Sequence, residues 1–142
     1  MLDKKLSKYA PWSIVALRLG VGIVFLVHGL GKLLNVGPSA MPIEGFASFL
    51  SSLGVPAASL LAWAVALVEA LGGLAILVGF MTRYAALLLS AVMLVALGMV
   101  HLSKGFSAGK GGYEYVLMLL LACVSLLLSG PGQKLVLGKK KE

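Results

Sequence analysis

Three ionisable side chains stand near the ends of long apolar runs and have the chemistry for proton exchange: His28, His101 and Glu114. Histidine titrates near neutral pH, and apolar surroundings shift the protonation of a glutamate toward the same range. We therefore treat these three as candidate catalytic residues. Three further side chains at the same level of the expected helices are candidates for ligand binding: Lys32, Tyr113 and Tyr115.

This set of six suits proton exchange with a small apolar or quinone-like molecule better than metal or haem chemistry. No H-x-x-x-H, E-x-x-H or cysteine spacing accompanies the histidines, so no metal site is predicted. Two isolated histidines could ligate a haem between the first and third helices, which is the weaker alternative. A plainer interpretation also stays open, because Glu114 suits a helix start and Tyr113 and Tyr115 suit a membrane interface.

A single carboxylate, Glu69, interrupts the apolar run from Leu60 to Phe80. An ionised carboxylate is costly inside a bilayer unless it is paired or protonated. Small residues at helical spacing share its face of the expected helix, namely Ala62, Ala66 and Gly73. That face allows neighbouring helices to approach closely, so Glu69 is expected to point into the interior of a helix bundle.

Arg18 is the predicted partner of Glu69. Counted from the expected cytoplasmic ends, Arg18 lies about six residues and roughly 9 Å deep in the first helix, and Glu69 about ten residues and roughly 15 Å deep in the second. An arginine side chain covers that difference, so we expect a buried Arg18–Glu69 ion pair. The alternative is that Arg18 extends to the headgroups and Glu69 is protonated.

The elements that position these residues are expected to be membrane-spanning helices. Of the 142 residues, 60% are hydrophobic and 12% charged, whereas soluble domains have about 45–50% and about 25%. Four apolar runs are long enough to cross a bilayer, at residues 12–34, 57–79, 84–102 and 113–129. Residues 43–54 alternate large apolar and small polar side chains, which predicts a short amphipathic interfacial helix. We expect one all-α domain, residues 1–142, that forms a four-helix membrane bundle.

Basic residues flank the apolar runs and account for the net charge of +7. This placement predicts that both termini are cytoplasmic in the plasma membrane and contact anionic lipid headgroups, and it argues against a nucleic acid partner. The residues concerned are Lys4, Lys5, Lys8, Arg83, Lys134, Lys139, Lys140 and Lys141. Arg18 interrupts the first apolar run and no A-x-A site follows, so we expect a retained helix rather than a signal peptide. The one cysteine, Cys123, lies in an apolar run and is expected to be a packed hydrophobe.

Four stretches, in the same order, resemble the DoxX family of small four-helix membrane proteins. They are LRLGVGIVFLVHGLGKLL at 17–34, FASFLSSLGVP at 46–56, VEALGGLAILVGFMTR at 68–83, and the segment 101–115 that begins HLSKGF and ends GGYEY. Family members are associated with quinone-linked sulfur oxidation, as a subunit of thiosulfate:quinone oxidoreductase, and with redox-defence assemblies containing superoxide dismutase and a sulfurtransferase. The resemblance implies that the family's polar positions are here Arg18, His28, Lys32, Glu69, Arg83, His101, Tyr113 and Glu114.

Three hypotheses about function follow. The first is a membrane subunit of a redox system that binds quinone or quinol beside His28, His101 and Glu114. The second is a non-catalytic anchor or assembly protein for redox-defence partners, and the third is a carrier of a small solute or lipid with Glu69 as its coupling site. A homo-oligomer stays open as well, because several glycines allow close helix contacts within or between protomers: Gly20, Gly22, Gly29, Gly72 and Gly73.

Overall fold

The computed structural model describes residues 2–138, which form helices and connecting loops only. The order is α1 (Leu2–Leu6), the 3-10 helix η1 (Ser7–Trp12), α2 (Ser13–Leu34), α3 (Ile43–Ser52), α4 (Ala58–Val78), α5 (Thr82–Ala96), the π-helix η2 (Leu97–His101), the short 3-10 helices η3 (Leu102–Lys104) and η4 (Ala108–Lys110), and α6 (Glu114–Ser129). The predicted all-α class is confirmed. Lys139, Lys140 and Lys141, which entered the prediction of orientation, lie outside the described residues.

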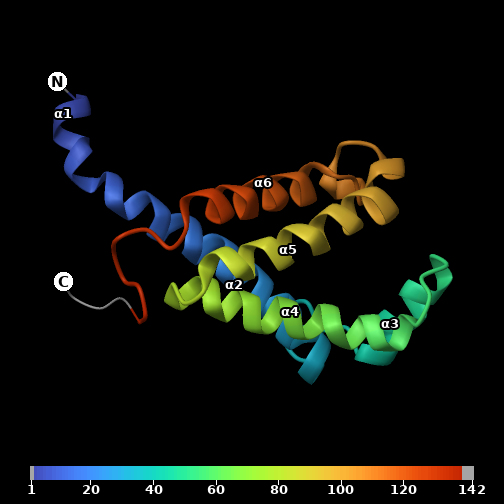
Figure 1. Cartoon of the computed structure of the whole chain (residues 1–142). Coiled ribbons are helices and arrows are strands. Elements are labelled where there is room, and N and C mark those ends of the chain that lie inside the picture. Colours follow the sequence, from blue (N-terminus) through green and yellow to red (C-terminus); the bar gives the residue numbers. More distant parts are fainter. Residues whose placement is uncertain (1, 139–142) are drawn as a thin grey trace.

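The predicted spans correspond to α2, α4, α5 with its η2 extension, and α6, and the predicted amphipathic segment corresponds to α3. Three helices of the described chain are long and apolar enough to cross a membrane: Leu2–Leu34, Ala58–Val78 and Thr82–Lys104. The fourth, α6, is apolar but has 16 residues, so it rises about 24 Å against roughly 30 Å of hydrocarbon. The first helix is longer than predicted, because α1 and η1 continue α2 toward the N-terminus (Figure 1).

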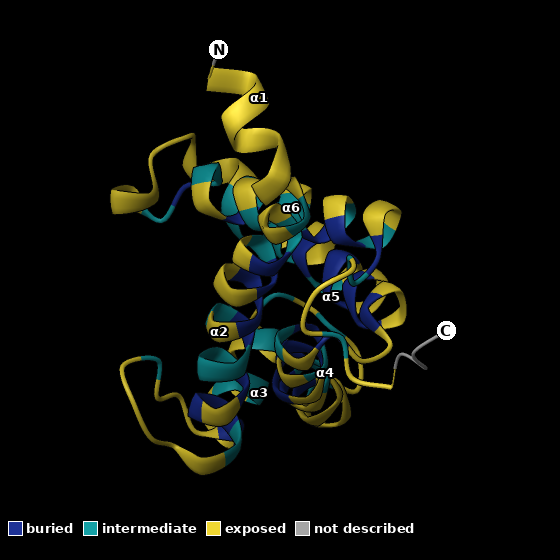
Figure 2. Ribbon diagram, turned by 90° about the vertical axis from the view of Figure 1, so that its left-hand side faces the viewer, coloured by how far each residue is buried: buried dark blue, intermediate teal, exposed yellow. Residues whose placement is uncertain are grey.

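The four long helices run alternately up and down, so the bundle has two distinct ends. At the first, called here the Arg18 end, α2 and α5 begin and α4 and α6 end; the opposite end, called the Lys32 end, carries α3 and the loop before α6. Figure 1 shows α4 and α5 diverging from their short connecting turn, so that the bundle is more open at the Lys32 end. Exposed residues make up α1 and the outer faces of the helices, and buried residues lie where the helices face one another (Figure 2).

Helices α2 and α4 form the most extensive contact in the molecule, along a seam of small residues. A Cβ added to Gly73 would lie 2.5 Å from the backbone nitrogen of Leu26, and one added to Gly29 would overlap the backbone of Ala70. Ala62 and Ala66 are fully buried along the same face of α4. The small-residue face predicted around Glu69 is therefore the α2–α4 contact, which fixes how the two helices are shifted along each other.

The larger apolar side chains pack where α4, α5 and α6 meet α2. Phe25, Ile76, Leu89 and Leu126 are buried in this cluster, and Gly72 leaves room for the side chain of Leu89. Cys123 is completely buried in the same cluster as a free thiol, as predicted. Helix α3 lies outside this core and packs on the first half of α4, so it covers one side of the Lys32 end.

Candidate functional site

Glu69 is buried, as predicted, but its partner is Lys32 rather than Arg18. Lys32 Nζ donates a hydrogen bond to Glu69 Oε2 within an ion pair, and the two side chains are 9% and 6% exposed. It is the one ion pair found among the described residues. The ammonium of Lys32 also lies 4.9 Å from the ring centroid of Phe46 on α3, a cation–π contact. The predicted Arg18–Glu69 pair is wrong.

Arg18 is 1% exposed and donates instead to five backbone carbonyls. The acceptors are Ile76 O at 2.8 Å, Leu77 O at 2.7 Å, Pro131 O at 3.1 Å, Lys134 O at 3.0 Å and Leu135 O at 2.7 Å. The guanidinium has five N–H donors, so each finds an acceptor. Two of the carbonyls belong to the last turn of α4, where the helix dipole favours a cation. Arg18 therefore ties α2 to the end of α4 and to the chain that follows α6.

The register of the α2–α4 seam explains why the predicted pairing failed. Arg18 lies beside Gly79, where a Cβ would be 2.6 Å from the guanidinium, so α2 begins well beyond the end of α4. The prediction had placed the two helix ends at one level. With the observed shift, Gly29 faces Ala70 and the side chain of Lys32, one turn further along α2, reaches Glu69.

Arg83, a position implied by the family resemblance, likewise donates to backbone carbonyls at a helix end, here that of α6. Its Nη1 donates to Leu127 O at 2.6 Å and to Leu128 O at 2.7 Å, in the last turn of α6. Gly130 ends that helix with a φ of 76°, and a Cβ there would crowd the Arg83 guanidinium. Both arginines therefore satisfy helix-terminal carbonyls at the Arg18 end, which accounts for them structurally.

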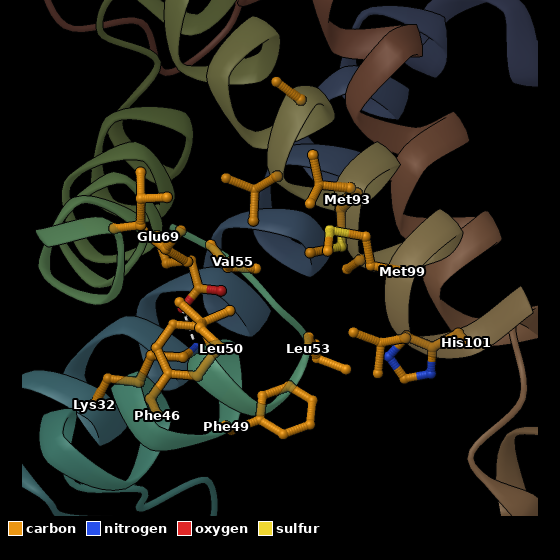
Figure 3. Close-up of a pocket in the computed structure, with 17 residues that line it drawn as sticks. Lys32, Phe46, Phe49, Leu50, Leu53, Val55, Glu69, Met93, Met99 and His101 are labelled. Atoms are coloured by element: carbon orange, nitrogen blue, oxygen red, sulfur yellow. Dashed lines mark hydrogen bonds and ion pairs between the residues drawn. The ribbon is translucent and has the colours of Figure 1, made fainter. Parts of the chain in front are cut away.

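A cavity of about 430 Å³ lies at the Lys32 end between α3, α4 and α5, and we call it the main cavity. Figure 3 shows Glu69, Lys32 and Phe46 on one side and Met93, Met99 and His101 on the other. Its lining is apolar apart from three ionisable side chains: Lys32, Glu69 and His101. The remaining lining residues are Phe46, Phe49, Leu50, Leu53, Val55, Leu61, Val65, Ala91, Val92, Met93, Val95, Ala96, Met99 and Val100.

His101 lines the main cavity and is the last residue of a π-helical turn, Leu97–His101, that extends α5. π-helical turns are rare and occur frequently at functional sites. The Nδ1 atom of His101 lies 2.8 Å from Gly111 O. Since a carbonyl oxygen only accepts, Nδ1 carries the hydrogen and Nε2 of the neutral ring is the acceptor nitrogen.

His28 lies apart from the main cavity, on the wall of a neighbouring hollow that we call the side cavity. The side cavity has a volume of about 330 Å³ and is lined by His28, Lys32, Ser39, Ala40, Met41, Phe46 and Phe49. The Nδ1 atom of His28 lies 2.9 Å from Val24 O, which makes Nδ1 the donor and leaves Nε2 as acceptor. Lys32, Phe46 and Phe49 are common to both cavities, so they form the wall between them.

The remaining predicted site residues lie where the loop meets α6: Tyr113 precedes the helix, and Glu114 and Tyr115 are its first two residues. Glu114 Oε1 accepts a hydrogen bond from Ala108 N at 2.6 Å, and the ring of Tyr113 packs edge-on against Phe106 with centroids 5.5 Å apart. Tyr115 is 46% exposed. Within residues 2–138, no hydrogen bond or ion pair joins His28, His101 and Glu114. The predicted set of six is thus divided among the main cavity, the side cavity and the start of α6.

The sequence prediction missed the apolar half of the site. Phe46 and Phe49 of α3 stack with ring centroids 6.5 Å apart and line both cavities, and Met93 and Met99 line the opposite wall. The alternating pattern of residues 43–54 indicated an amphipathic helix, but not which element its apolar face would cover. As for metals, no group of three or more His, Cys, Asp or Glu side chains in the described residues could hold an ion.

An all-helical bundle with three spanning-length apolar helices and a largely apolar cavity between them defines a small membrane protein with a candidate ligand site. The chain belongs to the DoxX family, whose model matches residues 13–102. The match covers α2 to η2 and therefore every residue of the main cavity.

The chain is also similar to three curated bacterial proteins. A Bacillus subtilis (strain 168) protein named "Putative oxidoreductase CatD" is 33% identical over 125 residues, 88% of this chain and 84% of the relative. An uncharacterized membrane protein of Mycobacterium tuberculosis is 32% identical over 87% of this chain and 78% of its own length. An uncharacterized protein of Haemophilus influenzae is 31% identical over 89% of this chain and 90% of its own length. No solved structure matches the chain significantly.

Proposed function

We propose that this protein is a membrane subunit of a redox system and that it binds the ring of a quinone or quinol in the main cavity. The observation that carries the proposal is the main cavity itself, an apolar hollow within an apolar bundle, with an ion pair on one wall and a histidine on another. The name of the Bacillus subtilis relative, an oxidoreductase, supports the redox class.

The size and lining of the main cavity fit such a ligand. Its volume of about 430 Å³ falls within the range of roughly 300–1,000 Å³ typical of small-molecule sites, which are mostly apolar with a few placed polar groups. Phe46 and Phe49 offer aromatic faces to a flat ring, and Met93 and Met99 offer polarisable contacts. Exposed residues at the rim, including Val95 and Met99, would let a hydrocarbon tail leave toward lipid.

The polar groups suit the two oxygens of the ring. A bound quinone takes up two electrons and two protons to become the quinol, and the quinol releases them in reverse. Lys32 has N–H groups to donate to a carbonyl oxygen, while His101 Nε2 and the Glu69 carboxylate accept from a hydroxyl. The residues therefore offer both donors and acceptors to this ligand.

The electrons would be exchanged with a redox-protein partner, in a sulfur-oxidising or oxidative-defence assembly of the kind the family resemblance implies. We place the protein in the plasma membrane with its N-terminal lysines and Arg18 end cytoplasmic, because Lys4, Lys5, Lys8 and Arg83 gather there. The main cavity is lined by residues of the Lys32 end, while at the opposite end Arg18 ties α2 to the chain after α6 by hydrogen bonds to Pro131, Lys134 and Leu135. This arrangement favours a one-sided binding site over a carrier, which needs access from both sides.

The proposal is tested by measuring the binding of decylubiquinone to the full chain in lipid nanodiscs. Ala96→Trp places an indole in the main cavity, whereas Ala64→Trp places one on an exposed face of α4 that does not line it. Saturable binding that Ala96→Trp abolishes and Ala64→Trp leaves unchanged is the expected result. Absence of binding, or equal binding by the two variants, would overturn the proposal and favour the anchor function.

A further inference from the structure

We propose that the Lys32–Glu69 pair transfers protons between the side cavity and a ligand in the main cavity. This inference rests on the proposed function, because it concerns what the pair does for a quinol bound there. It assigns a role to the side cavity and to an ion pair that would otherwise only hold α2 against α4.

The pair stands between the two cavities. Lys32 lines both of them, Glu69 lines the main cavity alone, and His28 lines the side cavity alone. The ionisable groups that face the pair from the two cavities are therefore His101 on the main side and His28 on the side-cavity side. One titratable group therefore lies on each side of the pair, His101 in the main cavity and His28 in the side cavity.

The two cavities differ in their surroundings. The lining of the main cavity is apolar apart from Lys32, Glu69 and His101, and its exposed members, such as Val95 and Met99, are apolar as well. Part of the side-cavity wall is instead the loop after α2, with Ala40 and Met41 exposed and Ser39 half-buried. The backbone of this loop is tied to α2 by the bond from Met41 N to Gly31 O, 3.2 Å. We therefore assign water to the side cavity and the ligand to the main cavity.

A proton can pass between the two members of the pair without changing the net charge of the pair. A buried ion pair and its neutral form, with the proton moved from lysine to glutamate, both have zero net charge, whereas either group charged alone in an apolar interior is costly. One proton is accepted at Glu69 Oε from a ligand hydroxyl while one leaves Lys32 Nζ toward His28 Nε2 or water in the side cavity. The proton on Glu69 then passes to Lys32 along their hydrogen bond, and the pair returns to its starting state.

A first measurement tests whether water reaches the side cavity and is excluded from the main cavity. It requires no redox reaction. Cysteines are introduced at Ser39, on the side-cavity wall, and at Val65, on the main-cavity wall; native Cys123 is fully buried and contributes little background. In nanodiscs, a charged methanethiosulfonate reagent is expected to label Ser39→Cys and not Val65→Cys. Equal labelling of both would overturn the proposal.

A second measurement follows protons during a single oxidation of bound decylubiquinol. Two ferricyanide ions take the two electrons, and a pH indicator reports the two protons released with the quinone. The double variant Lys32→Met/Glu69→Leu removes both charged groups of the proposed proton route. Met41→Trp fills the side cavity and leaves Lys32 and Glu69 in place. Val36→Trp is the matched control, because Val36 is exposed in the same loop and lines neither cavity.

The expected result is proton release slowed about 100-fold in the double variant and at least tenfold in Met41→Trp, within the range that positioned acid–base groups contribute. Val36→Trp keeps the wild-type rate, and Met41→Trp and Val36→Trp keep their affinity for decylubiquinol. The double variant also loses two groups that contact the ligand, so its rate is measured at saturating decylubiquinol. Wild-type rates in Met41→Trp overturn the proton route while leaving quinol binding intact. Failure of the wild type to bind decylubiquinol overturns both the route and the proposed function.

Discussion

Arg18 and Lys32 are two buried cations on the same helix, and the chain satisfies them in different ways. Arg18 is 1% exposed and donates to five backbone carbonyls, whereas Lys32 is 8% exposed and pairs with one carboxylate beside two cavities. The first arrangement uses every donor of the guanidinium and ties α2 to the end of α4 and to the chain after α6. The second leaves donor capacity on Lys32 and acceptor capacity on Glu69 at the edge of a hollow.

The two buried cations differ in the chemistry that their partners allow. Backbone carbonyls cannot change protonation, so Arg18 holds the ends of helices and of the following chain together and exchanges nothing. A lysine–glutamate pair can transfer a proton and regain its original state, so the Lys32 end has chemistry available that the Arg18 end lacks.

Replacing Arg18 with leucine is expected to be the most destabilising change in the bundle. It leaves five carbonyls without their donor, including two at the end of α4, and a loss of about 3–5 kcal/mol or more is typical when one member of a buried polar network is removed. Thermal unfolding in nanodiscs measures the loss. Arg83→Leu is the control and is expected to cost clearly less, because Arg83 is exposed and donates to two carbonyls.

Removing one member of the Lys32–Glu69 pair is expected to cost about 3–5 kcal/mol, since it leaves the other charge unpaired in an apolar interior. Lys32→Met and Glu69→Leu should each lower the unfolding midpoint, and the double variant should recover most of the loss. A double-mutant cycle by thermal unfolding measures the coupling. If the two single changes proved additive, the pair would not be formed as described.

Adding a methyl group at the α2–α4 contact tests how the two helices are shifted along each other, on which the Lys32–Glu69 pairing depends. Gly29→Ala is expected to lose about 1–3 kcal/mol, because its Cβ overlaps the backbone of Ala70. Gly20→Ala is the matched control on the same helix; nothing lies within 4 Å of its Cβ, so about 0.5–1 kcal/mol of stabilisation is expected. Unfolding midpoints that move together in both variants would contradict the observed seam.

The smallest effect is predicted for the two histidines, which were expected from sequence to act together. His101→Ala should weaken decylubiquinol binding about tenfold, the equivalent of one hydrogen bond of about 1.4 kcal/mol, with little change in stability. His28→Ala should leave the affinity near wild type, because His28 lines only the side cavity. Equal losses of affinity in the two variants would instead support the sequence prediction that His28 and His101 belong to one site.

The all-α class and the burial of Arg18 and Glu69 follow from local patterns and were confirmed. Helices also stand at the predicted spans and at the amphipathic segment, of which three are long enough to cross a membrane and α6 is shorter. The pairing was not accessible in this way, because helix length does not specify how far α2 is shifted along α4. That shift is set by Gly29 against Ala70 and by Arg18 beside Gly79, contacts between residues far apart in the chain.

The division of the predicted outer cluster has a similar cause. His101 ends a π-helical turn and contacts the backbone oxygen of Gly111, and neither feature has a clear mark in the sequence. Glu114 was assigned to the cluster by its level alone, and its carboxylate is occupied by the loop backbone at Ala108. The apolar face of residues 43–54 was recognisable, but its position over α4 was not.

The central claim, that the Lys32 end is a quinone site, is tested most directly by photocrosslinking. A decylubiquinone analogue with a diazirine on its ring is irradiated with the full chain in nanodiscs, and labelled peptides are identified by mass spectrometry. We expect labels on α3 and on residues 91–101, removed by excess decylubiquinone and absent in Ala96→Trp. Labels confined to lipid-facing surfaces, or unchanged in Ala96→Trp, would contradict the claim.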